Sequence, residues 1–553
     1  MRRRHFIQVA AAGTAGLLFS RMTSLAAAGI SVTNVPEKVW VKLGDQWYPA
    51  TSSNGVYAYR DIQVRFKQSG DALSVYITSP SIQLNAVKLQ WEFEMRPITK
   101  ILGDKWERSY GDLGWQLNDS FVSPWYMLIN DGQETSCFGV KTGCSTLCSW
   151  ITTGTGVEIM MDTTSGGTGV LLGARELHAA DIVTTKSTAA ETPFTTLQRF
   201  CKMMCPNPRL PKQPVYGIND WYFAYGNNSA DLIKKITGLM TGLAPDTDNR
   251  PFSVIDAGWA TYSPLLPGDG GFMDDFSKPN DKFKDMAVMA GDIKKLGMRP
   301  GLWTRPLCAK HDDKASLLLP KIPGRDDPKE PILDPTIAEN IERVKHNMAL
   351  YKQWGYELVK HDYTTYDIAG KWGFQMKDGI TSPGWSFNDK SKTTAEVMND
   401  LYRAIRVAAG DMYIIGCNTM SHLSAGVFEL NRIGDDTSGK DWERTRKMGV
   451  NTLGFRIAQH NAFYATDADC VGLTNDIAWA RNKQWMQLLA ESGTPLFISP
   501  DPAALDDEKK AFIKECFAKA AKVQPTGEPL DWMNNPQPQK WKLNGREVDF
   551  NWE

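Results

Sequence analysis

Short runs in which apolar and polar residues alternate dominate the chain from about residue 30 to residue 205. Clusters of Gly, Asn, Asp and Ser separate these runs, which include residues 39–43, 73–77, 87–93 and 169–172. A period of two with frequent turn residues predicts antiparallel strands, and no helical pattern interrupts them. We therefore expect an N-terminal antiparallel β-sandwich domain over residues 30–205, followed by a proline-rich linker that marks a domain boundary.

Beyond the linker the pattern changes to apolar strands that alternate with amphipathic helices. Eight strands are predicted, at residues 215–218, 252–256, 298–303, 356–362, 412–417, 428–433, 463–471 and 494–499. A helix is predicted after every strand except the fifth, at residues 229–243, 283–296, 337–354, 393–409, 442–460, 476–491 and 506–522. This alternation predicts an α/β fold with a (β/α)8 TIM barrel over residues 215–522. A doubly wound open sheet is the alternative, but no glycine-rich phosphate-binding motif follows the first strand.

The first residues of the chain have the pattern of an export signal. A basic start is followed by an apolar run at residues 9–19 and by small residues at 24–28, which predicts a signal peptide over residues 1–28. The sequence Arg3-Arg4-His5-Phe6-Ile7 resembles the twin-arginine type of signal. An uncleaved membrane anchor is the alternative, but the apolar run is short for a span. We expect export to the periplasm or the extracellular space, without a membrane span in the mature protein.

Composition narrows the classes of partner and cofactor. A length of 553 residues suits two or three domains, and residues 523–553 are expected to add a short C-terminal extension, at most a hairpin. The net charge of −1 gives no reason to expect nucleic acid or an anionic membrane as partner. The nine cysteines lack the spacing of a zinc site, so we expect no metal or cofactor and mostly buried thiols, with room for one or two disulfides. The oligomeric state stays open.

Carboxylates, tryptophans and cations follow nearly every strand of the predicted barrel, where the strand ends face one active site. In chain order these candidate site residues are Asp220, Trp221, Asp256, Trp259, Trp303, Arg305, Lys360, Asp362, Cys417, Asn418, Arg432, Asp435, Asp436 and Asp469. Taken alone, Asp362 is explained somewhat better as a loop cap than as a catalytic residue, but loop caps do not account for the tryptophans. Two carboxylates on a Trp-lined floor favour glycoside hydrolysis. The rival, a metal-dependent hydrolase, needs two or more His at strand ends, where only His361 stands.

These motifs resemble those of the melibiases, the α-galactosidases of glycoside hydrolase families 36 and 27, and family 36 is the closer of the two. Lys360-His361-Asp362 matches the K-x-D motif of the fourth strand, and Arg432 followed four residues later by Asp436 matches the acid/base motif. Residues 301–304 and 464–470 resemble the third-strand and seventh-strand motifs. The resemblance implies a secreted, retaining enzyme that cleaves terminal α-linked galactose from carbohydrates.

The same resemblance assigns roles to the site residues. Asp362 is the implied nucleophile and Asp436 the implied acid/base, with Asp435 as the close alternative. Lys360 is expected to hold a sugar hydroxyl and to keep Asp362 ionised. Arg432 is expected near the 2-hydroxyl side, Cys417 and Asn418 along the pocket, and Asp436 far enough from a cation to keep the raised pKa of an acid.

Two departures from the family pattern concern the choice of sugar. Ala257 stands where the family has a second carboxylate on the second strand, so selectivity at O6 is relaxed or a pentose such as arabinopyranose is admitted. Arg305 is either part of a salt bridge in the barrel rim or a contact to the substrate. The alternatives are therefore an α-N-acetylgalactosaminidase, a β-L-arabinopyranosidase or a galactosyl transferase, or an inactive sugar-binding protein.

Overall fold

The structure, a computed structural model, describes residues 34–93, 100–117, 122–263, 272–325, 330–377 and 379–553. The predicted signal peptide, residues 1–28, lies outside these ranges. Across the ranges described, no helix has both the length and the apolar character needed to cross a bilayer.

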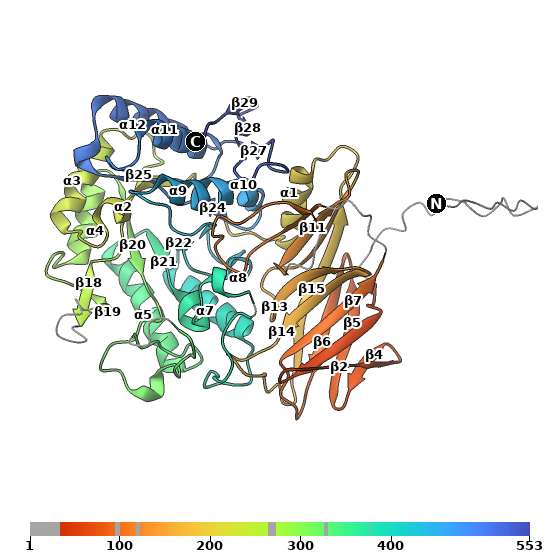
Figure 1. Cartoon of the computed structure of the whole chain (residues 1–553). Helices are drawn as coiled ribbons and strands as arrows, with labels where there is room; N and C mark the ends of the chain where they lie inside the picture. The colour runs from red at the N-terminus through yellow and green to blue at the C-terminus, as the bar shows by residue number, and fades with distance from the viewer. Residues whose placement is uncertain (1–33, 94–99, 118–121, 264–271, 326–329, 378) are drawn as a thin grey trace, which may run out of the picture. The chain divides into compact units, whose positions relative to one another are not determined.

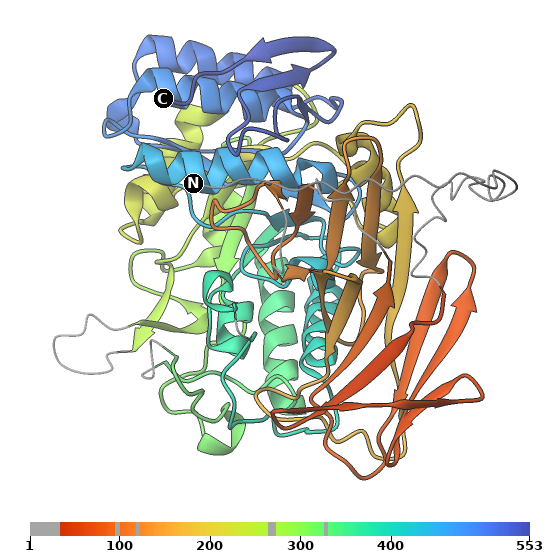
Figure 2. The same cartoon turned by 45° about the vertical axis from the view of Figure 1, so that its right-hand side comes forward.

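Antiparallel strands make up the N-terminal part of the chain. They are β1 (Lys38–Leu43), β2 (Gln46–Pro49), β3 (Thr51–Ser53), β4 (Val56–Tyr59), β5 (Ile62–Ser69), β6 (Ala72–Thr78), β7 (Ala86–Glu92), β8 (Lys100–Gly103), β9 (Gln116–Leu117), β10 (Ser123–Pro124), β11 (Tyr126–Asn130), β12 (Thr135–Val140), β13 (Leu147–Thr153), β14 (Gly156–Asp162) and β15 (Glu176–Lys186). One sheet has the order β10-β13-β14-β7-β1-β2 and the other the order β3-β4-β5-β6-β15-β12-β11-β8-β9. Figure 2 shows these strands in red to brown at the right of the view. The ring of Phe138 in β12 lies 6.0 Å from that of Trp150 in β13, so apolar side chains of the two sheets share a core. This arrangement fits the predicted sandwich.

Two sequence predictions are wrong within this part. Residues 169–172 form no strand, because only Val170 pairs, in an isolated antiparallel bridge with Leu84. A helix that the strand pattern hid, α1 (Pro193–Met204), precedes the linker. Thr192 caps this helix by accepting a hydrogen bond from the Thr195 amide, and Pro at the first helical position favours its start.

A curled parallel sheet follows, and it contains every strand predicted for the barrel. Its strands are β16 (Tyr216–Asn219), β17 (Phe252–Ile255), β20 (Arg299–Thr304), β21 (Leu358–His361), β22 (Tyr413–Gly416), β23 (Leu430–Arg432), β24 (Ala465–Asp467), β25 (Cys470–Leu473) and β26 (Leu496–Pro500). The order is β24-β23-β22-β21-β20-β17-β16-β26-β25. The predicted seventh strand is split, since its two halves, β24 and β25, are separated by Ala468 and Asp469. No ladder within the described ranges joins these two edge strands, so the sheet is not closed by hydrogen bonds.

Helices follow the strands of the parallel sheet, as the sequence pattern predicts. They are α2 (Trp221–Ala224), α3 (Ala230–Thr241), α4 (Met286–Lys295), α5 (Ala338–Trp354), α6 (Thr364–Ala369), α7 (Thr394–Ala409), α8 (Ser421–Ser424), α9 (Trp442–Thr445), α10 (Thr452–Arg456), α11 (Trp479–Glu491) and α12 (Asp507–Ala520) (Figure 1). After the fifth strand there is only the single turn α8, where no helix was predicted. The helix predicted at residues 442–460 is a chain of short pieces, because a π-helix, η3 (Arg446–Asn451), separates α9 from α10.

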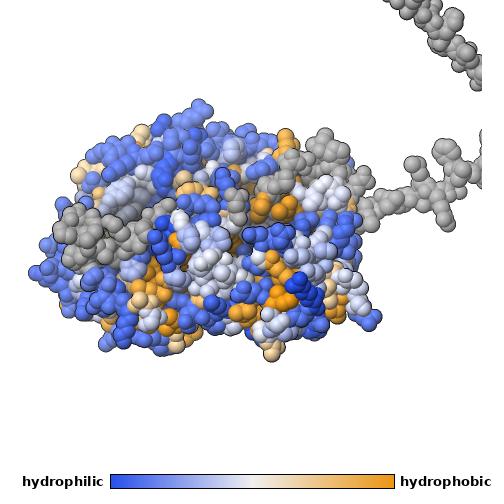
Figure 3. Space-filling model, turned by 60° about the horizontal axis from the view of Figure 1, so that its bottom comes forward, coloured by the Kyte–Doolittle hydropathy of each residue, from blue (hydrophilic) through white to orange (hydrophobic). Residues whose placement is uncertain are grey.

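Smaller elements complete the chain. A hairpin of β18 (Ala260–Ser263) and β19 (Phe272–Pro279) follows β17, and 3-10 turns stand at η1 (Ala315–Leu317), η2 (Gly373–Gln375), η4 (Ile457–Gln459) and η5 (Pro502–Ala504). The C-terminal extension contains the predicted hairpin, β28 (Lys540–Leu543) with β29 (Arg546–Asp549), and a short third strand, β27 (Glu528–Pro529). Viewed from below, apolar residues form separate patches among polar ones (Figure 3).

All nine cysteines are buried and none is in a disulfide. The prediction of buried thiols is confirmed, and the one or two disulfides that the sequence left room for are not formed.

Candidate active site

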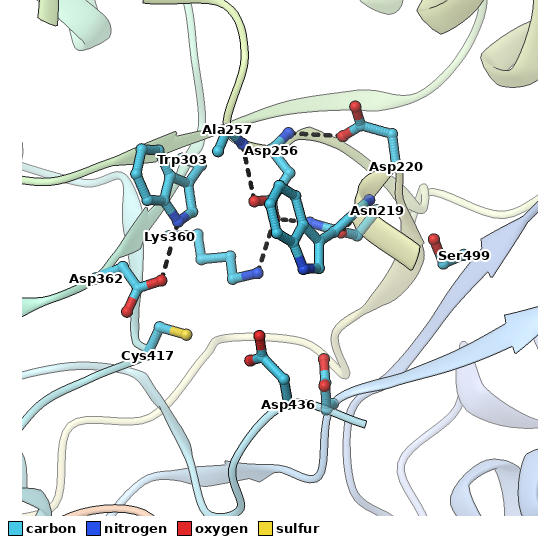
Figure 4. Close-up of polar contacts among 12 residues, drawn as sticks. Asn219, Asp220, Asp256, Ala257, Trp303, Lys360, Asp362, Cys417, Asp436 and Ser499 are labelled. Carbon is cyan, nitrogen blue, oxygen red and sulfur yellow. Dashed lines mark hydrogen bonds and ion pairs between the residues drawn. The ribbon is translucent and has the colours of Figure 1, made fainter. Parts of the chain in front are cut away.

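A cavity of about 590 Å³ lies at the carboxyl ends of the parallel strands. More than half of the predicted site residues line it, namely Trp221, Asp256, Trp303, Arg305, Lys360, Asp362, Asp435 and Asp436. The carboxylates of Asp256, Asp362 and Asp436 lie around the Lys360 side chain (Figure 4). The parallel register causes this convergence, because Trp303 of β20 stands opposite Lys360 of β21 and the two strands end together one residue later, at Thr304 and His361.

Two hydrogen bonds orient the carboxylate of Asp362. Trp303 donates its indole N–H to Oδ2 at 3.1 Å, and the Tyr363 amide donates to Oδ1 at 2.8 Å. Tyr363 has a φ of 68°, a conformation that non-glycine residues rarely adopt. Strained backbone of this kind concentrates at functional sites. Asp362 is thus held with both oxygens placed at the cavity wall.

The ammonium group of Lys360 pairs with Asp256, which corrects the expectation that it serves Asp362. Its Nζ lies 2.7 Å from Asp256 Oδ2, and both side chains are buried. Asn219 donates a second hydrogen bond to the same oxygen at 2.7 Å, and the Ala257 amide donates to Oδ1 at 2.8 Å. No ion pair to Asp362 is found among the residues that the structure describes. The pair presents one cation and one anion to the cavity.

Asp220 lies behind this pair and outside the cavity lining. Its Oδ1 accepts a hydrogen bond from the Asp256 amide at 2.6 Å, and its Oδ2 accepts one from Asn228 at 2.7 Å. Burial, and next the nearby charge of Asp256, raise the pKa of Asp220 to about 7. Asp220 therefore supports the loop that carries Asp256 and does not reach a ligand in the cavity.

The substitution Asp220→Asn is expected to flatten the pH dependence of stability between about pH 4 and pH 7. With its raised pKa, Asp220 keeps a proton in the folded chain that the unfolded chain releases above about pH 4. The stability from this group is therefore full below about pH 4 and is lost as the pH rises through about 7. An amide does not titrate, so the variant lacks this decline. The measurement is Tm against pH.

The matched control for this experiment is Asp231→Asn, which removes a carboxylate from the exposed surface of α3, where 94% of the Asp231 side chain is accessible. We expect the control to keep the slope of the wild type. A slope that Asp220→Asn leaves unchanged would contradict the raised pKa of Asp220.

Asp435 and Asp436 leave the sixth strand among three arginines. Arg432 approaches Asp436 at 2.8 Å, and Arg444 approaches Asp435 at 2.7 Å. Arg108, from the N-terminal part of the chain, lies 3.1 Å from Asp435 and 3.6 Å from Asp436. Asp436 is the more accessible of the two, with 39% of its side chain exposed against 17% for Asp435.

The charges around Asp436 contradict the expectation of a raised pKa. Burial alone would raise the pKa of this carboxyl, but the positive charges of Arg432, Arg108 and Lys360 outweigh burial and lower it. The expectation failed because Arg108 is remote in sequence and Arg432 was assigned to the sugar instead.

The sequence left two roles open for Arg305, a salt bridge in the rim or a contact to the substrate, and the structure shows the salt bridge. Its guanidinium binds Asp367 through two hydrogen bonds of 2.7 and 3.1 Å and reaches Glu330 at 2.5 Å. It also lies over the ring of Tyr363, 4.3 Å from the centroid. Arg305 therefore fixes the rim of the cavity, and its charge is already paired.

The remaining predicted site residues do not line the cavity. Trp259 is fully buried, and its indole N–H donates to the Trp303 carbonyl at 2.9 Å. Cys417 and Asn418 are buried beneath the cavity, and Asn418 donates a hydrogen bond to Glu107. None of these three residues lines the cavity, so their contact with a substrate stays a prediction.

Arg432 and Asp469 form a buried ion pair below the sixth strand, with 2.7 Å between Nη2 and Oδ2. Asp469 also accepts hydrogen bonds from the Thr437 amide at 2.8 Å and from the Tyr222 hydroxyl. The Asp469 carboxylate therefore binds only other residues of the chain among the contacts described, and its pairing with Arg432 holds the guanidinium next to Asp436. Neither side chain lines the cavity.

The sequence prediction missed lining residues that are mostly aromatic or apolar. They are Arg108, Tyr110, Tyr262, Met273, Phe276, Glu330, Tyr363, Trp372 and Phe374. Trp372 stacks on Tyr366 with 4.3 Å between ring centroids, and Phe374 meets Tyr110 edge to face at 5.0 Å. Most of them lie in loops without periodicity, so only adjacency to a strand end, as for Tyr363, could have signalled them.

No group of three or more His, Cys, Asp or Glu side chains within the described ranges is placed to hold a metal ion. The chemistry available to the cavity is that of carboxylates, a lysine, arginines and aromatic rings.

The fold of this chain is similar to that of solved α-galactosidases, including those of glycoside hydrolase family 36. The α-galactosidase of Thermus thermophilus, solved with p-nitrophenyl α-D-galactopyranoside, matches 93% of this chain and 98% of its own at 15% identity, with a TM-score of 0.61. The family 36 α-galactosidase AgaA of Geobacillus stearothermophilus matches 91% of this chain and 79% of its own at 12% identity, with a TM-score of 0.58. No family model matches the sequence, and no curated protein does. At these identities the likeness concerns the fold.

Proposed function

We propose that the chain is a glycoside hydrolase that removes terminal α-linked galactose from oligo- or polysaccharides with retention of anomeric configuration. The observation that carries the proposal is the placement of Asp362 and Asp436, from the fourth and sixth strands, on one cavity. The likeness of the fold to α-galactosidases supports galactose as the sugar that is released. Carboxylates on either side of a scissile glycosidic bond are the catalytic pair of such enzymes.

In the proposed mechanism Asp362 attacks the anomeric carbon. The hydrogen bonds from Trp303 and the Tyr363 amide hold its carboxylate in place, so little reorientation precedes the attack. Asp436 donates a proton to the leaving oxygen and then removes one from the water that hydrolyses the glycosyl–enzyme. Two displacements at the same carbon restore the original configuration.

The Lys360–Asp256 pair is proposed to select the hydroxyl groups of the sugar. The lysine can donate a hydrogen bond to one hydroxyl while the carboxylate accepts one from its neighbour, which orients the ring over Trp303 and Trp221. Aromatic faces complement the apolar face of a sugar ring.

A second candidate, a β-L-arabinopyranosidase, is favoured by the side of the cavity around Ala257. This sugar has the ring hydroxyls of galactose but no hydroxymethyl arm. Met273 and Phe276 line the cavity beside Ala257, and the Met273 sulfur accepts a hydrogen bond from the Gly258 amide at 3.1 Å. The apolar surroundings leave no carboxylate for the hydroxyl of that arm.

Hydrolysis of p-nitrophenyl glycosides by the purified protein tests the proposal. We expect the α-D-galactopyranoside to be cleaved, the β-D-galactopyranoside to resist, and proton NMR to show α-galactose as the first sugar released. Faster cleavage of the β-L-arabinopyranoside would favour the second candidate, and faster cleavage of the N-acetyl-α-galactosaminide would favour an α-N-acetylgalactosaminidase.

Other outcomes would replace the proposal. Galactosides formed from added acceptor sugars in excess of free galactose would indicate a transferase. Galactose binding in calorimetry without cleavage of any glycoside would indicate an inactive sugar-binding protein. β-Galactose as the first product would contradict double displacement.

A further inference from the structure

A loop from the N-terminal part of the chain lies against the end of the sixth strand. Ser109 forms a parallel bridge with Gly434. The Ser109 amide donates to the Ile433 carbonyl at 2.9 Å, and the Asp435 amide donates to the Ser109 carbonyl at 2.8 Å. The loop thus pairs alongside the end of the strand that carries the acid/base candidates, and it places Arg108 beside them.

Buried polar contacts hold the part of this loop that precedes Arg108. Asp104 binds Arg456 at 2.7 Å and Gln459 at 3.0 Å, and all three side chains are buried. Glu107 accepts hydrogen bonds from Asn418 and, at 2.7 Å, from the Gly373 amide. The backbone of Arg108 is therefore fixed relative to the sixth strand.

The guanidinium of Arg108 reaches both carboxylates but is shared unequally. Its Nη2 lies 3.1 Å from Asp435 and its Nη1 lies 3.6 Å from Asp436, with only 5% of the side chain exposed. Asp435 has a second partner in Arg444, at 2.7 Å. Because Arg444 already neutralises Asp435, the positive charge of Arg108 also acts on Asp436.

We propose that Arg108 is a positioning residue that sets the proton affinity of Asp436 and thereby the upper pH limit of the reaction. The inference rests on the proposed role of Asp436 as acid/base. A general acid must be protonated in the free enzyme, so kcat/KM falls above the pKa of that group. An arginine within 4 Å favours the ionised carboxylate.

Among the residues that the structure describes, the other charged or titratable groups around Asp436 are Arg432 and Asp435 on the sixth strand and its loop, Lys360 and Asp362 at the end of the fourth strand, and the hydroxyls of Tyr222 and Tyr363. All of these groups belong to the part of the chain that contains the parallel sheet, whereas Arg108 comes from the N-terminal part. Its removal changes one charge near Asp436 and leaves the strands of the barrel unaltered.

The test compares kcat/KM against pH for the wild type, Arg108→Gln, Arg108→Lys and Arg444→Gln, on the best glycoside of the panel. Arg108→Gln should move the alkaline limb upward by about 1 pH unit, since one of three cations is lost. Arg108→Lys keeps the charge and should restore the limb of the wild type. Arg444→Gln should move the limb clearly less than Arg108→Gln does, because Arg444 pairs with Asp435, lines no part of the cavity and leaves Arg108 beside Asp436.

Two kinetic results would overturn the inference. One is an Arg108→Gln limb that coincides with the limb of the wild type. The other is an equal upward shift in Arg444→Gln, which would assign the titrating carboxyl to Asp435. If the limb is unshifted and only KM changes, Arg108 contacts the ligand and does not act on the acid/base.

Carbon-13 NMR of the protein labelled at aspartate carboxyls separates this inference from the proposed function. The signal of Asp436 is assigned as the one absent from Asp436→Asn and is titrated in the wild type and in Arg108→Gln. A rise of about 1 unit in its pKa supports the inference, and an unchanged titration overturns it, whether or not any glycoside is cleaved.

Discussion

Asp362→Asn is expected to lower kcat by more than about 10⁴-fold, because the amide cannot form the glycosyl–enzyme. The fold should survive, since an amide oxygen can still accept the hydrogen bond from Trp303 or from the Tyr363 amide. The measurement is turnover of an aryl α-galactoside, with Tm as the check on folding. Asp411→Asn, at a side chain that is 82% exposed, is the matched control and should keep full turnover.

The anomeric configuration of the galactosyl azide that forms when azide is added to an Asp362 variant gives a second test of Asp362 as the nucleophile. In Asp362→Ala a small anion can enter the vacated space and attack the substrate directly, which gives the β-galactosyl azide. Turnover equal to the wild type in Asp362→Asn, or an α-azide from Asp362→Ala, would remove Asp362 from the role of nucleophile.

Asp436→Ala is expected to lower kcat/KM by about 10²–10⁴-fold on substrates with poor leaving groups. The loss should be smaller on aryl glycosides with acidic phenols, because these leave without a proton. Azide should then accelerate release of the glycosyl–enzyme and give the α-galactosyl azide. The measurement is the dependence of kcat/KM on the pKa of the leaving phenol.

Asp435→Ala is the comparison for this experiment, because Asp435 shares Arg108 with Asp436 and lies next to it in the chain. It should show a weaker dependence on the leaving group. If Asp435→Ala instead shows the steep dependence and the rescue by azide, the acid/base role passes to Asp435.

The strands of the parallel sheet were predictable because buried parallel strands are continuous apolar runs between helices of regular period. The helix α1 was not, since its twelve residues follow a long stretch of alternation. The split of the seventh strand at Asp469 was not predictable either. It depends on Arg432, Thr437 and Tyr222, which approach Asp469 only in the folded chain.

Within the site, the residues that follow strand ends were predictable and their partners were not. Lys360 stands two residues before Asp362, and strand alternation puts the two on the same face, but the position of Asp256 directs the ammonium of Lys360 to the second strand. Trp259 looked like a sugar platform, yet it packs against the ring of Trp354 at 6.1 Å between centroids. Arg108 carries no signal at all, because its place depends on the docking of one part of the chain on another.

The nine buried thiols form no disulfide, so the folded state is held by non-covalent contacts, namely packing, hydrogen bonds and ion pairs. They are spread over its parts, with Cys137 in β12, Cys417 beneath the cavity and Cys516 in α12. A thiol that is shielded in the folded chain reacts with an alkylating reagent only when its surroundings open. The rate of labelling at each cysteine therefore reports how often that part of the molecule opens, without any engineered probe.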